Sequence, residues 1–162
     1  MGAKETPAKI HTLSTALDKV RKYCAYQERS QQEVRDKFYD LGLHSKEVEQ
    51  GIVILIEEGF INEERFAMSF AGGKFRMKQW GRDKIKAALR QKKVSDYCIR
   101  KALNAIPDGD YIRTLETILT KKSKEVKEKN GIRKNYLLAR YAMSRGFEGN
   151  LVWEVLKADP DG

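Results

Sequence analysis

The sequence predicts an all-α protein made of three tandem three-helix repeats that form an elongated, curved array. Apolar residues recur at helical spacing through most of the 162 residues, and the only prolines are Pro7, Pro107 and Pro160, none inside a periodic segment. The stretch 52–56 is apolar enough for a strand, but it continues a helical stripe. No other segment has a convincing strand pattern, so helices are expected throughout.

The repeat is visible as five apolar positions that return at offsets of 51 and 53 residues. In chain order the matched positions are Val34, Ile85 and Leu138; Phe38, Leu89 and Ala142; Leu43, Val94 and Phe147; Val48, Ile99 and Val152; and Ile52, Leu103 and Leu156. A longer helix is expected before each set, at about 13–26, 63–80 and 111–129. We therefore expect a flexible N-terminus over 1–11 and repeats over 12–60, 61–107 and 108–158, which stack on one another because a unit of this size has a thin core.

Helix start and stop signals agree with these boundaries. Ser30 followed by Glu33 is a capping box, and Asn62 precedes two acids where the helix dipole favours them. Gly42 and Gly59 can end helices in the left-handed conformation. Gly81 marks a further turn between helices.

Charge is unevenly distributed along the chain, whose formal net charge is +9. The segment 27–64 holds ten acids and four bases, whereas 74–93 holds nine bases and one acid, and 121–145 nine bases and two acids. A solvated surface is the plainer explanation for a charge run. The separation of an acidic first repeat from two basic ones nevertheless favours a polyanionic partner such as nucleic acid.

Helical spacing is expected to place basic residues together on one side of a helix. Arg82, Lys86, Arg90 and Lys93 are expected in one sector, and the third repeat carries a similar set. Trp80 and Phe75 could stack on nucleotides, but we favour a core position for Trp80. The candidate residues for contact with DNA or another polyanionic partner are Lys74, Arg76, Lys78, Arg82, Lys86, Arg90, Lys93, Lys121, Lys122, Lys124, Arg133, Lys134, Arg140 and Arg145.

Signals for catalysis, metals or membranes are weak. Cys24 and Cys98 are expected to be reduced and partly buried, and His11 and His44 have no metal-ligand spacing. The stretch 72–74 lacks the remaining residues of a phosphate-binding loop. No apolar run is long enough for a membrane span, and the first residues lack a secretory apolar core, so a cytoplasmic location is expected. We expect a binding protein that is not an enzyme and needs no cofactor or metal.

Several short motifs together resemble the RecX regulatory proteins. The second repeat resembles the central signature of that family through the run 60–67 and through Phe70, Trp80-Gly81, Ile85, Leu89, Lys93-Val94 and Ala102-Leu103. The first repeat is similar to the family's opening motif through Arg29-Ser30, Glu33-Val34, Phe38 and Gly42. The resemblance covers about residues 14 to 157 and is loosest in the third repeat. Gly72-Gly73 departs from the resemblance, because a charged, helix-favouring pair is more usual there. Glycine is unfavourable in a helix interior, so a kink or a close approach of a neighbouring backbone is expected at this pair.

The resemblance implies an all-helical array that binds the RecA recombinase filament, in its helical groove, and restrains its ATP hydrolysis and strand exchange. It also implies binding to single- and double-stranded DNA and no enzymatic activity. We expect a monomer without a membrane partner. The residues alone leave a rival open, namely a DNA-binding protein with helix-turn-helix-like repeats that acts independently of recombinase; a ribonucleoprotein component is less favoured, because no RNA-binding signature is present.

Overall fold

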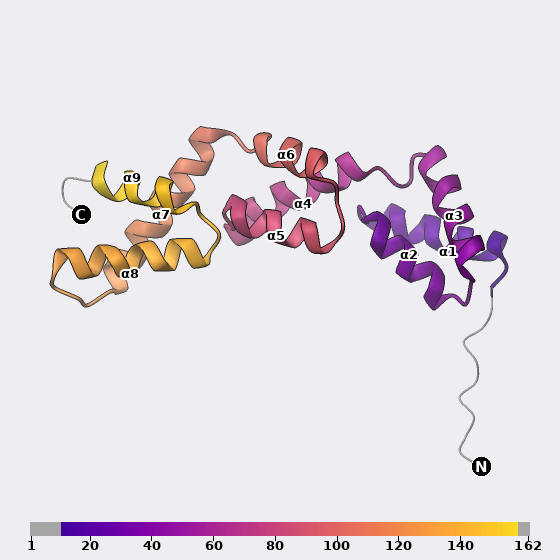
Figure 1. Ribbon diagram of the computed structural model, residues 1–162, viewed down its shortest axis with the longest axis horizontal. Coiled ribbons are helices and arrows are strands. Elements are labelled where there is room, and N and C mark those ends of the chain that lie inside the picture. Colours follow the sequence, from indigo (N-terminus) through magenta and orange to yellow (C-terminus); the bar gives the residue numbers. More distant parts are fainter. Residues whose placement is uncertain (1–10, 159–162) are drawn as a thin grey trace, which may run out of the picture.

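The computed structural model describes residues 11–158, and over that range every regular element is a helix (Figure 1). Residues 1–10, which include nearly all of the expected flexible N-terminus, lie outside the described residues. The helices are α1 (Leu13–Tyr26), α2 (Gln31–Asp40), α3 (Ser45–Glu57), α4 (Glu63–Lys78), α5 (Arg82–Gln91), α6 (Asp96–Asn104), α7 (Asp108–Glu125), α8 (Gly131–Ser144) and α9 (Gly149–Ala158).

The helices form three successive units of three, arranged end to end in a gently arched array (Figure 1). The second helices of the three units, α2, α5 and α8, all lie along the lower edge in that view. The predicted fold class, three tandem three-helix repeats in an elongated and curved array, is confirmed.

The local signals in the sequence account for the helix ends. Ser30 and the Glu33 side chain form the reciprocal capping box, and the Asn62 side chain accepts a hydrogen bond from the Arg65 N–H at 2.8 Å. Gly42 and Gly59 have φ angles of +88° and +82°. Helix α4 ends at Lys78, two residues earlier than expected, because Gln79 adopts a left-handed conformation with φ +55°.

Helix α7 also differs from its expected range of 111–129. It begins at Asp108, directly after Pro107, and its first turn holds Asp108 and Asp110, which the helix dipole favours. It ends at Glu125 because Val126 is extended. The sequence pattern missed the start of α7, since the acids before Tyr111 carry no apolar periodicity.

The repeat positions form the cores of the three units. Fourteen of the fifteen are buried, and the fifteenth, Leu103, is half-buried against the same core. The first unit has its own core, which extends from Ala16 to Ile61. The second and third units share one continuous core from Phe66 to Leu156.

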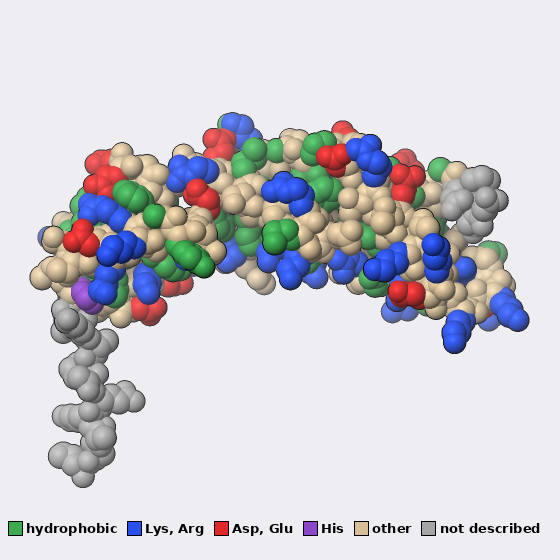
Figure 2. Space-filling view, turned by 180° about the vertical axis from the view of Figure 1, so that it is seen from behind, with side chains coloured by type: hydrophobic (Ala, Val, Ile, Leu, Met, Phe, Trp, Pro, Cys, Tyr) green, Lys and Arg blue, Asp and Glu red, His purple; other side chains and the backbone are tan. Residues whose placement is uncertain are grey.

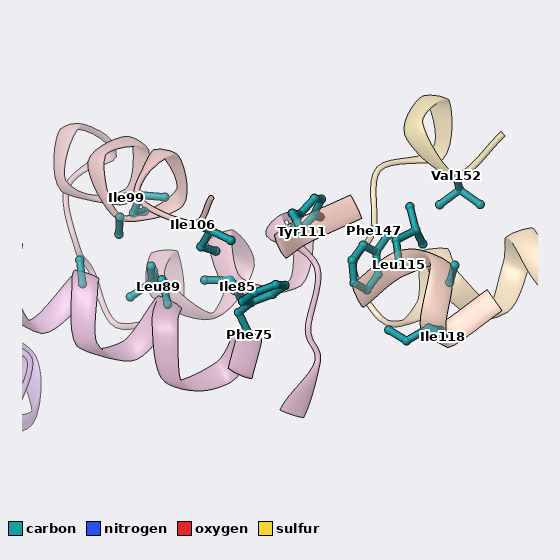
Figure 3. Close-up of a cluster of buried hydrophobic side chains, with 14 of the residues drawn as sticks. Phe75, Ile85, Leu89, Ile99, Ile106, Tyr111, Leu115, Ile118, Phe147 and Val152 are labelled. Carbon is teal, nitrogen blue, oxygen red and sulfur yellow. The ribbon is translucent and has the colours of Figure 1, made fainter. Parts of the chain in front are cut away.

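The joint between the second and third units is therefore apolar and tightly packed. Tyr111 lies between Phe75 and Phe147, with ring centroids 5.8 Å and 5.0 Å away (Figure 3). The Gly81 N–H donates to the Arg145 carbonyl at 2.8 Å. A Cβ at Gly81 would overlap backbone atoms of Gly146 and Phe147, so the two chain segments can approach this closely only because position 81 is glycine.

A second backbone hydrogen bond completes this joint. The Asp83 N–H donates to the Gly146 carbonyl at 2.9 Å. Gly146 has a φ of +100°, a conformation that favours glycine. The start of α5 and the α8–α9 turn are therefore joined backbone to backbone.

The joint between the first and second units is polar instead. Arg65 at the start of α4 donates to the Glu28 carboxylate at 2.5 Å and to the Gly59 carbonyl at 2.9 Å. Lys92 lies 3.4 Å from a carboxylate oxygen of Glu33. Ion pairs thus connect these two units, while their apolar cores stay separate.

The close approach of a neighbouring backbone expected at Gly72-Gly73 was wrong. Helix α4 continues through both glycines to Lys78. A Cβ at Gly72 would lie 2.6 Å from Nη1 of Arg76, whose guanidinium covers it, and nothing lies within 4 Å of the corresponding position at Gly73. Among residues 11–158 no neighbouring backbone comes close to either glycine. Packing of α4 in the shared core maintains the helix despite their low helix propensity.

Candidate nucleic-acid interface

Positive charge is concentrated on the second and third units. Residues 61–107 contain twelve bases and four acids, 108–158 eleven bases and seven acids, and 12–60 seven bases and nine acids. Figure 2 shows Lys and Arg side chains gathered along the lower edge of the array, from its middle toward the C-terminal unit. This basic edge, formed by the second and third units, is the candidate site.

Many acids of the N-terminal half are occupied by internal contacts. Glu49 accepts from Arg35 at 2.8 Å, and Glu58 accepts from Arg21 at 2.9 Å. These ion pairs hold the pKa values of Glu49 and Glu58 below their usual range, chiefly through the hydrogen bonds from the arginines. The first unit is consequently less of an acidic surface than its sequence suggests.

Arg82, which the sequence places in the basic sector, has a structural role in the joint between the second and third units. Its guanidinium donates to Glu148 at 3.1 Å and to Asp108 at 3.0 Å, and it lies 3.8 Å from the ring centroid of Tyr111. The Tyr111 hydroxyl accepts a hydrogen bond from the backbone N–H of Arg82 at 2.8 Å and donates one to the Glu148 carboxylate. Burial and the bond to Glu148 raise the pKa of Tyr111. Arg82 is thus committed to contacts inside the molecule.

Three further candidates also have internal partners. Arg145 donates to the carbonyls of Lys78 and Gln79 and so covers the end of α4. Lys122 lies 3.5 Å from Glu125 and 4.5 Å from the ring centroid of Tyr141. Arg90 is 3.6 Å from Asp96, but both side chains are exposed, so that pair contributes little.

The other ten candidates form no ion pair with any residue in 11–158. Helix α5 presents Lys86, whereas Lys93 lies beyond the helix end in a left-handed conformation, outside the expected helical sector. The ten are Lys74, Arg76, Lys78, Lys86, Lys93, Lys121, Lys124, Arg133, Lys134 and Arg140. These ten are the members of the predicted set whose charge is available to a partner.

Trp80 combines a core contact with a charged surface. Its ring is half-buried against the shared core, and the ammonium groups of Lys74 and Lys84 lie 4.9 Å and 4.7 Å from its centroid. Lys74 and Lys92 lie 5.5 Å and 5.7 Å from the ring centroid of Phe70. Cations held over aromatic faces in this way are positioned in advance of any contact with phosphate.

The sequence interpretation missed two of these lysines, Lys84 on α5 and Lys92 at its C-terminal end. For Lys84 a weak signal was present, because it lies four residues after Trp80. No comparable spacing marked Lys92, whose aromatic neighbour Phe70 is 22 residues earlier in the chain. Phe75, considered for stacking, is buried in the shared core and is not available to a nucleotide.

The third unit also contains an open groove of about 900 Å³ between α7, α8 and α9. Its apolar lining includes Leu119, Leu138 and Val155. Two of the predicted basic residues, Lys124 and Lys134, lie at this groove together with Lys129.

The described residues offer little for other chemistry. No group of three His, Cys, Asp or Glu residues within 11–158 could hold a metal ion. Cys24 and Cys98 are free and buried, and burial raises the pKa of the Cys24 thiol to about 11. Over the same range no helix combines the length and apolar character needed to cross a membrane.

Fold and surface together define a class: an all-helical array of three-helix units with one basic edge. A family model described as "RecX, second three-helix domain" matches residues 62–103. The regulatory protein RecX of Clostridium tetani is 33% identical over 132 residues, which cover 80% of this chain and 58% of that protein. The RecX of Chlorobaculum tepidum is 26% identical over 144 residues, 89% of this chain and 88% of that protein.

A solved structure agrees with these sequence matches at the level of the fold. The crystal structure of RecX from Lactobacillus salivarius superposes with a TM-score of 0.83 at 22% identity, covering 90% of this chain and 95% of that one. The chain belongs to the RecX family of regulatory proteins. It spans a little over half the length of the clostridial relatives, 58% for Clostridium tetani and 57% for Clostridium perfringens.

Proposed function

We propose that this protein binds DNA along its basic edge and thereby engages the RecA recombinase filament in the cytoplasm, in the helical groove of the filament. Bound there, it reduces recombinase ATP hydrolysis and strand exchange without carrying out catalysis itself. Membership of the RecX family supports a regulatory role, and the arched array of three units suits an extended, repeating partner.

The observation that carries the proposal is the set of ten basic residues that form no ion pair with any other described residue, distributed over the second and third units. Each contact with phosphate releases counterions and adds affinity independent of sequence. Contacts from linked units reinforce one another, because after the first unit binds, the others act at high effective concentration. Several modest contacts along one edge can therefore give a stable complex.

The DNA contact is tested by neutralising Lys78, Lys86 and Lys93 together, each to Gln. If all three meet phosphate, the slope of log K against log salt falls by about 2.7 on duplex and about 2.1 on single strands. A matched variant neutralises three exposed lysines of the first unit, Lys19, Lys22 and Lys46, and should leave the slope unchanged. Equal effects of the two variants would contradict a localised basic edge.

The recombinase contact is tested separately, by titrating the protein into recombinase that hydrolyses ATP on single-stranded DNA. DNA is kept in large excess, so that competition for DNA cannot lower the rate. A fall in ATP hydrolysis under these conditions supports the filament as the partner. An unchanged rate, with DNA binding intact, would instead support the rival DNA-binding protein that acts independently of recombinase.

A further inference from the structure

Helix α8 presents an aromatic ring between two arginines on its outer face. Tyr136 is 60% exposed, and Arg133 and Arg140 are its neighbours at three residues before and four residues after. Both arginines are exposed, and neither forms an ion pair within residues 11–158. The helix contains no Asp or Glu, so no charge on α8 opposes an anionic partner.

The orientation of the Tyr136 ring is set by a neighbouring aromatic side chain. Trp153 on α9 lies edge-to-face with it, with ring centroids 5.2 Å apart and an interplanar angle of 74°. Trp153 is itself half-buried and packs against the shared core. Tyr136 is therefore oriented before any partner arrives, which lowers the entropy cost of binding.

The other aromatic rings of the basic region are less available. Lys74 and Lys84 lie over Trp80, and Lys122 lies over Tyr141. No cation in 11–158 lies over Tyr136. Among the aromatic side chains of the third unit, Tyr136 thus combines high exposure with flanking positive charge.

A flat exposed ring between guanidinium groups matches the chemistry of single-stranded nucleic acid. Unpaired bases stack on aromatic side chains, while arginines contact the phosphates on either side. Arg133 and Arg140 are two helical turns apart, about 10.5 Å along the axis, so they can contact phosphates on both sides of a stacked base. A duplex keeps its bases paired and stacked inside, and it cannot use the ring in this way.

We propose that Tyr136, oriented by Trp153 and flanked by Arg133 and Arg140, is a stacking site for an unpaired base. This site gives the third unit a preference for single-stranded over double-stranded nucleic acid. The proposal rests on the proposed function, in that it assigns a ligand to one part of the basic edge.

The test compares the binding of oligo-dT and of a duplex of equal length to the full chain carrying Tyr136→Ala, Tyr136→Leu or Tyr136→Phe. Loss of one stacked base weakens oligo-dT binding by about 5- to 150-fold for Ala and Leu, while Phe retains most of the affinity. Duplex affinity changes less than about twofold. The Leu variant keeps an apolar contact with Trp153, so it separates loss of the flat ring from loss of packing.

Tyr97→Ala is the matched control, because Tyr97 on α6 is 57% exposed and should not affect the ratio of the two affinities. The salt slope of the Tyr136 variants stays at the wild-type value, since no charge is removed. Equal losses on oligo-dT and duplex, or no loss on oligo-dT in both the Ala and Leu variants, would overturn the stacking site. The lysine variant described above still reports on the basic edge, so failure of the stacking site and failure of DNA binding are distinguishable.

Discussion

Replacing Gly81 by alanine tests whether the second and third units are joined through their backbones. The φ of Gly81 is −79°, which alanine adopts readily, so the substitution introduces no backbone strain of its own. The added methyl group would overlap the Gly146 carbonyl group and the Phe147 nitrogen, which cannot rotate away as a flexible side chain can. The start of α5 must then move away from the α8–α9 turn.

The cost follows from what this movement breaks. Two backbone hydrogen bonds, from Gly81 to Arg145 at 2.8 Å and from Asp83 to Gly146 at 2.9 Å, would lengthen or be lost. At about 0.5–1.5 kcal/mol each they account for about 1–3 kcal/mol. Overpacking adds a further cost of about 1–3 kcal/mol. The free energy of unfolding should fall by about 2–6 kcal/mol in Gly81→Ala.

Urea unfolding followed by far-ultraviolet circular dichroism measures this change, and Gly73→Ala is the matched control. Gly73 lies inside α4 with nothing within 4 Å of the added carbon, so its substitution should raise the free energy of unfolding by about 0.8–1 kcal/mol. Glycine-to-alanine substitution is thus expected to lower the free energy of unfolding at position 81 and to raise it at position 73. If Gly81→Ala were as stable as the wild type, the close packing of the joint would not contribute to stability and the reasoning would be refuted.

Gln79 and Cys24 give two further predictions. Gln79→Gly should raise the free energy of unfolding by about 0.5–1 kcal/mol, because Gln79 has a φ of +55°, and a lower urea midpoint would contradict this explanation of the α4 end. Burial raises the pKa of the Cys24 thiol to about 11, so the thiol of the unfolded chain ionises at a lower pH than that of the folded chain. The contribution of this difference to the free energy of unfolding is fully present below about pH 9 and decreases as the pH rises toward 11. This decrease in the free energy of unfolding amounts to at most about 2.7 kcal/mol. Urea titrations at pH 8.5 and 10.5 measure it, and it should be absent in Cys24→Ala. If the variant had the same pH dependence as the wild type, Cys24 would not be the source of the decrease.

The fold was predictable because its signals are local or repeated. The capping box at Ser30, the left-handed turn at Gly42 and the N-cap at Asn62 each involve residues close in sequence. The five apolar positions of each repeat identify its core without knowledge of the tertiary contacts, since every repeat contributes the same pattern. The two ends of α7 and the region of Gly72 were mispredicted where the apolar periodicity is interrupted or where helix propensity competes with packing.

The candidate site was only partly predictable, because a basic residue does not show in sequence which acid it will meet. Arg82 pairs with Asp108 and Glu148, which lie 26 and 66 residues further along the chain. The guanidinium of Arg145 likewise reaches the carbonyls at the end of α4. Nothing in the spacing of α5 distinguishes Arg82 from Lys86, which has no ion-pair partner in the described part of the chain. Contact of the remaining basic residues with DNA stays a prediction.

The contrast between the two joints has a mechanical consequence. The first unit is attached to the second through Arg65 with Glu28 and Lys92 with Glu33, partly exposed pairs of a kind that contributes about 0–1 kcal/mol each and weakens with salt. The joint between the second and third units instead buries Phe75, Tyr111 and Phe147 in one continuous core, which salt does not screen. Rising ionic strength should therefore loosen the attachment of the first unit while the other two units stay packed together.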